Sequence, residues 1–430
     1  MRTVIKIVLA AAAVAALVLH PRALAEEPAA AAPAAKDAGP ATKEEVRTLT
    51  EELRRLKLEL GLRDVEYQSY GGLGPAASKV YFAPKGLSIG GYGEMTYTNV
   101  RQGADDQSDL LRAVLYVGYR FSDRIVMNSE IEFEHAGKEV AVEFAYLDFL
   151  VNDALRVRAG NLLVPMGITN ELHEPPFFNG VLRNDVEKNI IPATWSENGV
   201  GLHGEYAGLR YQAYLINGLD VQAASAEEPV SAGEWLRRAR TLGGEARAQT
   251  LAGVLALHYA AGPATVGGSV YHGRAGQGLR TAAGEAVQAD VTIAEAHATV
   301  AWRGVAAKAL YAAGSLTDTA LLEQVLPNNP VLGSRVRGGY VEAAYDVLTL
   351  ATPGSEASLS PFVRYEAYDL NARVAPGFTR DPSVDRSVVT AGLTWKPLST
   401  VALKADWQRR DSRAAGSQTQ QVNLGAGFAF

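Results

Sequence analysis

The sequence predicts an all-β fold: a transmembrane antiparallel β-barrel of about 16 strands, preceded by a short periplasmic coiled-coil helix. Three observations point to it. Apolar and polar side chains alternate in successive segments of about ten residues from Leu87 onward, as in strands with one face in lipid. The last segment, residues 421–430, keeps this alternation and ends on Phe430. Short turns alternate with long polar loops between the segments.

Residues 1–25 have the pattern of a secretory signal peptide. Arg2 and Lys6 precede an apolar run from Ile7 to Leu19, and Ala23-Leu24-Ala25 is a small-residue cleavage pattern. Cleavage there would remove three basic residues and lower the formal net charge from −6 to −9, which gives no reason to expect nucleic-acid binding. The chain contains no cysteine, so the fold uses no disulfide.

Residues 26–41 form an Ala/Pro spacer, and residues 42–61 are expected to form a helix. Its apolar side chains step by three and four residues, a coiled-coil seam made of Val46, Leu49, Leu53, Leu56 and Leu60. The alternative is an amphipathic helix that lies on its own domain. The seam is shorter than three heptads, so a coil would need support from an oligomeric barrel. Residues 62–86 are expected to be a linker, and residues 87–430 the barrel.

The barrel prediction rests on sixteen alternating segments. They are residues 87–98, 109–120, 125–135, 140–151, 155–161, 198–206, 209–219, 249–260, 264–273, 291–302, 305–315, 336–348, 358–369, 386–396, 400–410 and 420–430. In residues 401–410, Leu403 and Trp407 would face lipid, whereas Lys404 and Asp406 would face the lumen. A charged lumen in a barrel of this size predicts an aqueous channel. The connections at residues 136–139 and 349–357 fit the turn-and-loop alternation least well.

The longest connection, residues 162–197, is expected to fold into the lumen as a constriction loop. It carries apolar side chains that a solvated loop would not need: Phe177, Phe178, Ile190, Ile191 and Trp195. If these pack on the inner wall, Arg183 and Lys188 lie near the passage. The alternative is an external loop that packs on its neighbours or on another subunit.

The chain resembles the phosphate-selective porin O and P family. The resemblance rests on Gly90-Gly91-Tyr92-Gly93-Glu94, on R-V-R-A-G-N-L-L-V-P-M-G from Arg156 to Gly167, and on the terminal Phe430. It implies a homotrimeric 16-stranded channel in the outer membrane of a Gram-negative bacterium, in contact with lipid. It also implies that the barrel-assembly machinery reads Phe430, and that lumen cations at Arg156, Arg158, Arg183 and Lys188 favour anions such as phosphate. Similar channels with a coiled coil take dicarboxylates, so the solute stays open.

The acidic third strand, with Glu130, Glu132 and Glu134, opposes an anion preference, so we expect that preference to be weak to moderate. A non-selective porin, or a structural tether whose coil contacts peptidoglycan, is the alternative. The sequence contains none of the motifs H-E-x-x-H, G-x-S-x-G or a P-loop, and no enzyme or cofactor is expected. The scattered histidines, His173 among them, predict satisfied polar side chains rather than a metal site.

Overall fold

The computed structural model describes residues 48, 52, 68–101, 105–223, 229–352 and 354–430. The chain divides into two units, residues 1–64 and 65–430, and the second contains all the strands. The expected signal peptide and spacer lie outside the described residues. So does the coiled-coil seam of Val46, Leu49, Leu53, Leu56 and Leu60.

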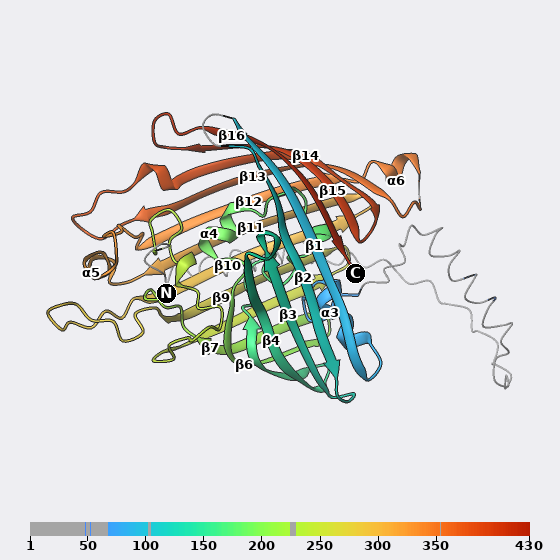
Figure 1. Ribbon diagram of the computed structural model, residues 1–430, viewed down its shortest axis with the longest axis horizontal. Coiled ribbons are helices and arrows are strands. Elements are labelled where there is room, and N and C mark those ends of the chain that lie inside the picture. The colour runs from blue at the N-terminus through green and yellow to red at the C-terminus, as the bar shows by residue number, and fades with distance from the viewer. Residues whose placement is uncertain (1–47, 49–51, 53–67, 102–104, 224–228, 353) are drawn as a thin grey trace, which may run out of the picture. The chain divides into compact units, whose positions relative to one another are not determined.

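Sixteen antiparallel strands form a closed barrel, which confirms the predicted fold class (Figure 1). Each strand pairs with its neighbours in the chain, and β1 closes the ring on β16 with Tyr92 opposite Ala429. The strands are β1 (Gly86–Arg101), β2 (Gln107–Arg120), β3 (Ile125–Glu134), β4 (Glu139–Asn152), β5 (Leu155–Leu163), β6 (Ser196–Tyr206), β7 (Leu209–Asn217), β8 (Leu251–Ala261), β9 (Ala264–Arg274), β10 (Asp290–Trp302), β11 (Val305–Leu316), β12 (Arg335–Tyr345), β13 (Ser358–Arg373), β14 (Asp385–Leu398), β15 (Val401–Ser412) and β16 (Thr419–Ala429).

Alternation along the strands separates an apolar outer face from a polar inner face. In β15, Leu403 and Trp407 are exposed on the outside, whereas Lys404, Asp406 and Gln408 are buried inside, as predicted. Every backbone group in the ring has a neighbouring strand to bond with, because a closed sheet has no edge. An apolar exterior around a polar interior is the arrangement that a membrane-spanning barrel requires.

One end of the barrel carries tight turns and the other carries longer connections, as the sequence predicted. The short connection at residues 135–138 contains the 3-10 helix η1 (His135–Gly137). The connection between β12 and β13 contains α6 (Leu348–Ala351), which explains why residues 349–357 exceed the length of a tight turn. The other helical segments in connections are η2 (Pro175–Phe177), α4 (Asp185–Ile190), η3 (Arg237–Ala239), α5 (Thr319–Val325) and η4 (Pro382–Val384).

The terminal Phe430 lies on the outer face of β1, at the seam where the ring closes. Its backbone exchanges two hydrogen bonds with Gly91, of 2.9 and 3.0 Å. A Cβ added to Gly91 would lie 2.8 Å from the Phe430 ring, and one added to Gly93 would lie 2.5 Å from the Phe428 ring. The glycines of the first strand therefore make room for the two terminal aromatic rings.

The expected linker, residues 62–86, is corrected in its described part. Residues 75–82 form a helix, α3 (Pro75–Phe82), which packs against the inner wall at β1, β2 and β3. Pro at its first position is favourable there because the first N–H groups of a helix have no partner within it. Among the described residues, no helix is both long and apolar enough to cross a membrane.

Candidate functional site

Residues 164–195, called the inner loop here, connect β5 to β6 and lie against the inside of the barrel. On one side, the His173 Nε2 lies 3.1 Å from the Glu130 carboxylate of β3. On the far side, the Glu366 carboxylate of β13 accepts hydrogen bonds from the first two N–H groups of α4, at 2.7 and 3.2 Å. An acidic side chain at a helix N-terminus is favourable because the N–H groups there need an acceptor. These contacts fix the loop across the lumen.

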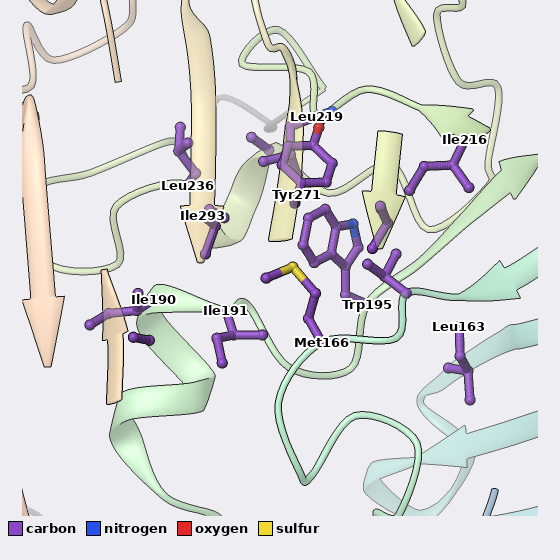
Figure 2. Packing of buried hydrophobic residues seen from close by; sticks show 14 of the residues in the cluster. Leu163, Met166, Ile190, Ile191, Trp195, Ile216, Leu219, Leu236, Tyr271 and Ile293 are labelled. Carbon is purple, nitrogen blue, oxygen red and sulfur yellow. Dashed lines mark hydrogen bonds between the residues drawn. The ribbon is translucent and has the colours of Figure 1, made fainter. Parts of the chain in front are cut away.

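The apolar residues of the inner loop form an interior core with a second inward segment. The described residues of the connection between β7 and β8, 218–223 and 229–250, are called the second loop here. They place Trp235 fully inside, where its indole N–H donates to the Gly333 carbonyl at 3.0 Å. Figure 2 shows Trp195 of the inner loop beside Tyr271 of β9, with Met166 next to Trp195, and the Trp195 and Tyr271 rings are 4.9 Å apart. The two loops therefore pack into one apolar cluster within the barrel.

Helix α3 occupies the half of the lumen nearer the tight turns. Gly90 and Gly118 leave space for it, since a Cβ on either would lie within 3 Å of an α3 atom. The Glu174 carboxylate of the inner loop accepts hydrogen bonds from the N–H groups of Ala76 and Ala77, at 3.2 and 3.1 Å. The inner loop and α3 thus support each other although they are far apart in the sequence.

Arg158 faces the interior as the alternation predicts, but it does not line an open passage. It is 2% exposed, its guanidinium lies 2.8 Å from the Asp148 carboxylate, and it stacks 4.2 Å above the Tyr146 ring. Asp148 also bonds His203, and the Tyr81 hydroxyl of α3 donates to it at 2.8 Å. This correction has a physical cause: the Tyr81 side chain of α3 reaches the ion pair, with its hydroxyl bonded to both Asp148 and Arg158, and helps to bury it.

Arg156 is also inward and largely covered. It is 8% exposed, its guanidinium lies 3.0 Å from Asp153 in the adjacent turn, and it stacks 4.8 Å from the Tyr70 ring. The two arginines of β5 are therefore paired with carboxylates, and their charges are largely compensated.

The loop cations Arg183 and Lys188 have different surroundings from the two arginines of β5. Arg183 is half-buried and donates to the His173 carbonyl at 3.3 Å, while Lys188 is exposed. Arg237 of the second loop donates to the carbonyls of Lys188 and Ala193, at 3.2 and 3.0 Å. The structure thus joins Lys188, one of the two loop cations of the sequence prediction, to a third cation that the prediction missed. The pattern W-L-R-R-A-R, an aromatic anchor before a basic run, was the available signal.

Many of the lumen carboxylates have cationic partners, which the sequence could not show. The pairs are Glu94, Glu132 and Glu134 with Arg112, Glu342 and Glu366 with Arg364, and Asp185 with Arg410. The acids that seemed to oppose an anion preference are therefore largely engaged in holding the wall and the inner loop.

His173 and Lys188 are among the loop residues whose pKa values are displaced. Burial disfavours the charged form of His173, but the facing Glu130 carboxylate outweighs it and raises the pKa of His173 to about 9. Partial desolvation in the lumen, together with the neighbouring Arg237, lowers the pKa of Lys188. The carboxylates of Asp185 and Glu234 act in the opposite direction and favour the charged form of Lys188.

The closed ring and its inward loop define the class of fold, the outer-membrane porin barrel. OmpT of Vibrio cholerae in its trimer form is 13% identical with a TM-score of 0.52, over 81% of this chain and 100% of that one. Salmonella typhi OmpF in complex with daunomycin is 13% identical with a TM-score of 0.52, over 80% and 97%. The anion-selective porin from Comamonas acidovorans is 11% identical with a TM-score of 0.50, over 80% and 99%. At these identities the likeness shows the fold.

Sequence similarity places the chain more narrowly. It is 37% identical over 362 residues to an uncharacterised protein of Aquifex aeolicus (strain VF5), and the match covers 80% of each chain. The chain belongs to the same family as that protein. No protein-family profile matches it.

Proposed function

We propose that the protein is an outer-membrane diffusion channel for small hydrophilic solutes, with a preference for anions. One observation carries the preference: Arg183 and Arg237 donate to backbone carbonyls, whereas several lumen carboxylates of the wall, such as Glu132 and Glu342, are paired with arginines. A guanidinium bound to a carbonyl keeps its full charge, while one bound to a carboxylate is compensated. The inward loops therefore bring guanidinium groups to the lumen that are bonded to carbonyls rather than to carboxylates.

The distance between such a charge and the passing solute decides how strongly the charge acts on it. A group on a loop that crosses the lumen lies close to any passing solute, and screening at physiological salt extends over about 8 Å. A confined path with charges of one sign raises the local concentration of counter-ions. Arg183, Lys188 and Arg237 thus take the role that the sequence assigned chiefly to Arg156 and Arg158.

The remaining features of the proposal rest on the sequence resemblance and on the fold. They are a homotrimer, an N-terminal coil in the periplasm, insertion guided by Phe430, and phosphate as the anion, with dicarboxylates as the alternative solute. The trimeric form of a structural neighbour supports the oligomer. The exposed apolar outer face supports the membrane location.

A planar bilayer with a salt gradient tests the preference. The wild-type protein should give a reversal potential of the sign expected for anions, and the double change Arg183→Gln with Arg237→Gln should bring it close to zero. The matched control is Arg280→Gln with Arg303→Gln, which also removes two positive charges. Arg280 likewise donates to a backbone carbonyl, that of Gly284 at 2.8 Å, but in the loop after β9, and Arg303 lies exposed in a tight turn.

The control should leave the reversal potential unchanged. A cation-selective wild type, or equal shifts in the two double variants, would contradict the assignment to the inward loops. A folded barrel without conductance would contradict the channel itself and favour a tether.

A further inference from the structure

Three potential metal ligands converge where the inner loop meets β3 and β4. The His173 Nε2 lies 3.1 Å from the Glu130 Oε1 and 3.8 Å from the Glu143 Oε2. One ligand atom from each residue lies within 4.8 Å of the others. Glu130 is fully buried, His173 is 2% exposed, and the Glu143 side chain is 13% exposed. The cluster is therefore largely shielded from solvent, and Glu143 is its most accessible residue.

Glu143 reaches this cluster through a β-bulge. In the pairing of β3 with β4, Glu130 is opposite Phe144 and Ile131 is opposite Val142, so Glu143 is the extra residue. Regular alternation would send Glu143 outward, because its neighbour Phe144 points inward and is fully buried. Bulges are frequent next to functional sites, where they redirect a side chain. Here the redirected side chain is a second carboxylate facing the same imidazole.

Two carboxylate oxygens in the cluster lack a hydrogen-bond donor. Neither Glu130 Oε2 nor Glu143 Oε2 accepts a hydrogen bond from any group in the described part of the chain. A buried carboxylate oxygen without a donor is costly, since nothing replaces its lost hydration. The neighbouring guanidinium of Arg112 pairs with Glu94, Glu132 and Glu134 instead. A positive charge between Glu130 and Glu143 would therefore stabilise the two carboxylates.

The orientation of His173 suits a metal ligand. Its Nδ1 lies 2.9 Å from the Asn170 carbonyl, which can only accept, so Nδ1 carries the hydrogen. In the neutral ring, the lone pair of Nε2 then points at the two carboxylates. Metal-ligating histidines commonly have their second nitrogen held by a carbonyl in this way. Either a proton on Nε2 or a cation between the three groups can satisfy this geometry.

We propose that Glu130, Glu143 and His173 bind a first-row divalent transition-metal ion, with Zn²⁺ as the best fit. Four-coordinate Zn²⁺ with ligand bonds of about 2.0–2.2 Å places neighbouring ligand atoms about 3.3–3.6 Å apart. The observed 3.1 and 3.8 Å lie on either side of that range. One imidazole with two carboxylates suits Zn²⁺ or its neighbours better than Ca²⁺ or Mg²⁺, which prefer oxygen alone. The ion would bind the inner loop to the barrel wall.

Calorimetric titration with Zn²⁺ tests the site in the full-length protein, purified in detergent and freed of metal with a chelator. We expect one high-affinity ion per chain, and binding weakened about tenfold or more in Glu143→Gln and in His173→Gln. His203→Gln is the matched control. His203 is also 2% exposed and lies 2.8 Å from Asp148, but an arginine takes the place of the second carboxylate there. This variant should bind Zn²⁺ as the wild type does.

A second measurement needs no variant. Co²⁺ added to the wild-type protein should give the visible absorption bands of a four-coordinate ion, and Zn²⁺ should displace it. Absence of stoichiometric Zn²⁺ binding, or binding equally strong in all three variants, would overturn the proposal and leave His173 as a protonated partner of the carboxylates. A site that takes Ca²⁺ but neither Zn²⁺ nor Co²⁺ would overturn it too.

Discussion

Replacing Glu174 with alanine tests whether the inner loop holds α3 inside the barrel. The Glu174 carboxylate uses both oxygens, one for the Ala76 N–H and one for the Ala77 N–H. Both donors belong to the first turn of α3, where no partner exists within the helix. Loss of a helix cap costs about 0.5–2 kcal/mol, and hydrogen bonds to a charged group contribute about 1.5–3 kcal/mol each. Water that bonds the freed N–H groups recovers part of this free energy, so we expect α3 docking to weaken by about 2–4 kcal/mol.

Hydrogen exchange followed by mass spectrometry measures that change directly. A loss of about 2–4 kcal/mol corresponds to roughly a 30- to 700-fold faster exchange of the α3 amides, at 1.4 kcal/mol for each factor of ten. The strands should keep their protection, because the remaining contacts of the ring are unaffected. Glu174→Gln keeps one acceptor oxygen, so its effect should lie between the wild type and Glu174→Ala.

The reasoning fails if α3 exchanges less than about threefold faster in Glu174→Ala, since that would be under 1 kcal/mol. It fails as well if strand and helix amides lose protection together, because the loop would then support the whole barrel rather than α3. In the first case the other α3 contacts suffice. These are Tyr81 with Asp148, at 2.8 Å, and the Asn128 amide with the Ala77 carbonyl, also at 2.8 Å.

Three further predictions follow from local geometry. Arg158→Met should lower the free energy of unfolding by about 3–5 kcal/mol, because Asp148 loses a buried partner, and should leave the reversal potential unchanged; a selectivity loss without destabilisation would contradict this. Gly91→Val should destabilise barrel closure by about 1–3 kcal/mol in thermal unfolding, since its Cβ would lie 2.3 Å from a carbonyl oxygen, whereas Gly253→Val, with no atom within 4 Å, should not. The lowered pKa of Lys188 predicts that its side chain loses its charge, and that the anion preference declines, as the pH rises toward the ordinary lysine value of about 10.4. Lys188→Arg should keep the preference over the same pH range. Identical pH profiles of the wild type and Lys188→Arg would contradict this prediction.

The strands were predictable because a membrane barrel repeats one physical requirement sixteen times. Each strand must present apolar side chains to lipid and polar ones to the lumen, so period-two alternation locates it without further information. Helix α3 was missed for the opposite reason. Its sequence, P-A-A-S-K-V-Y-F, is short, and its stability comes from groups distant in the chain, such as Glu174 and Asp148. Local sequence carries no signal for such contacts.

The candidate site shows what the period-two alternation of the strands can predict and what it cannot. It predicted correctly that Arg158 faces inward, because the side-chain period of a strand fixes the face. It could not predict that Asp148 of the adjacent strand would stand opposite, since that depends on the register of β4 with β5. It could not predict either that α3 would cover both. A charge on the inner face is therefore a candidate for selectivity only when its partners are known.

The same limit explains why the second loop was overlooked. Its arginines matter because Arg237 reaches the carbonyl of Lys188, a contact between two loops that are separate in the chain. If Arg237 contacted a carboxylate instead of that carbonyl, its charge would be compensated. The sequence would not reveal the difference, because its residue types would be nearly the same. In the channel that we propose, selectivity thus follows from which cations meet carbonyls and which meet carboxylates. That distinction is made by loop packing around Trp195 and Trp235, and it is the reason that exchanging loop arginines should act on selectivity while exchanging β5 arginines should act on stability.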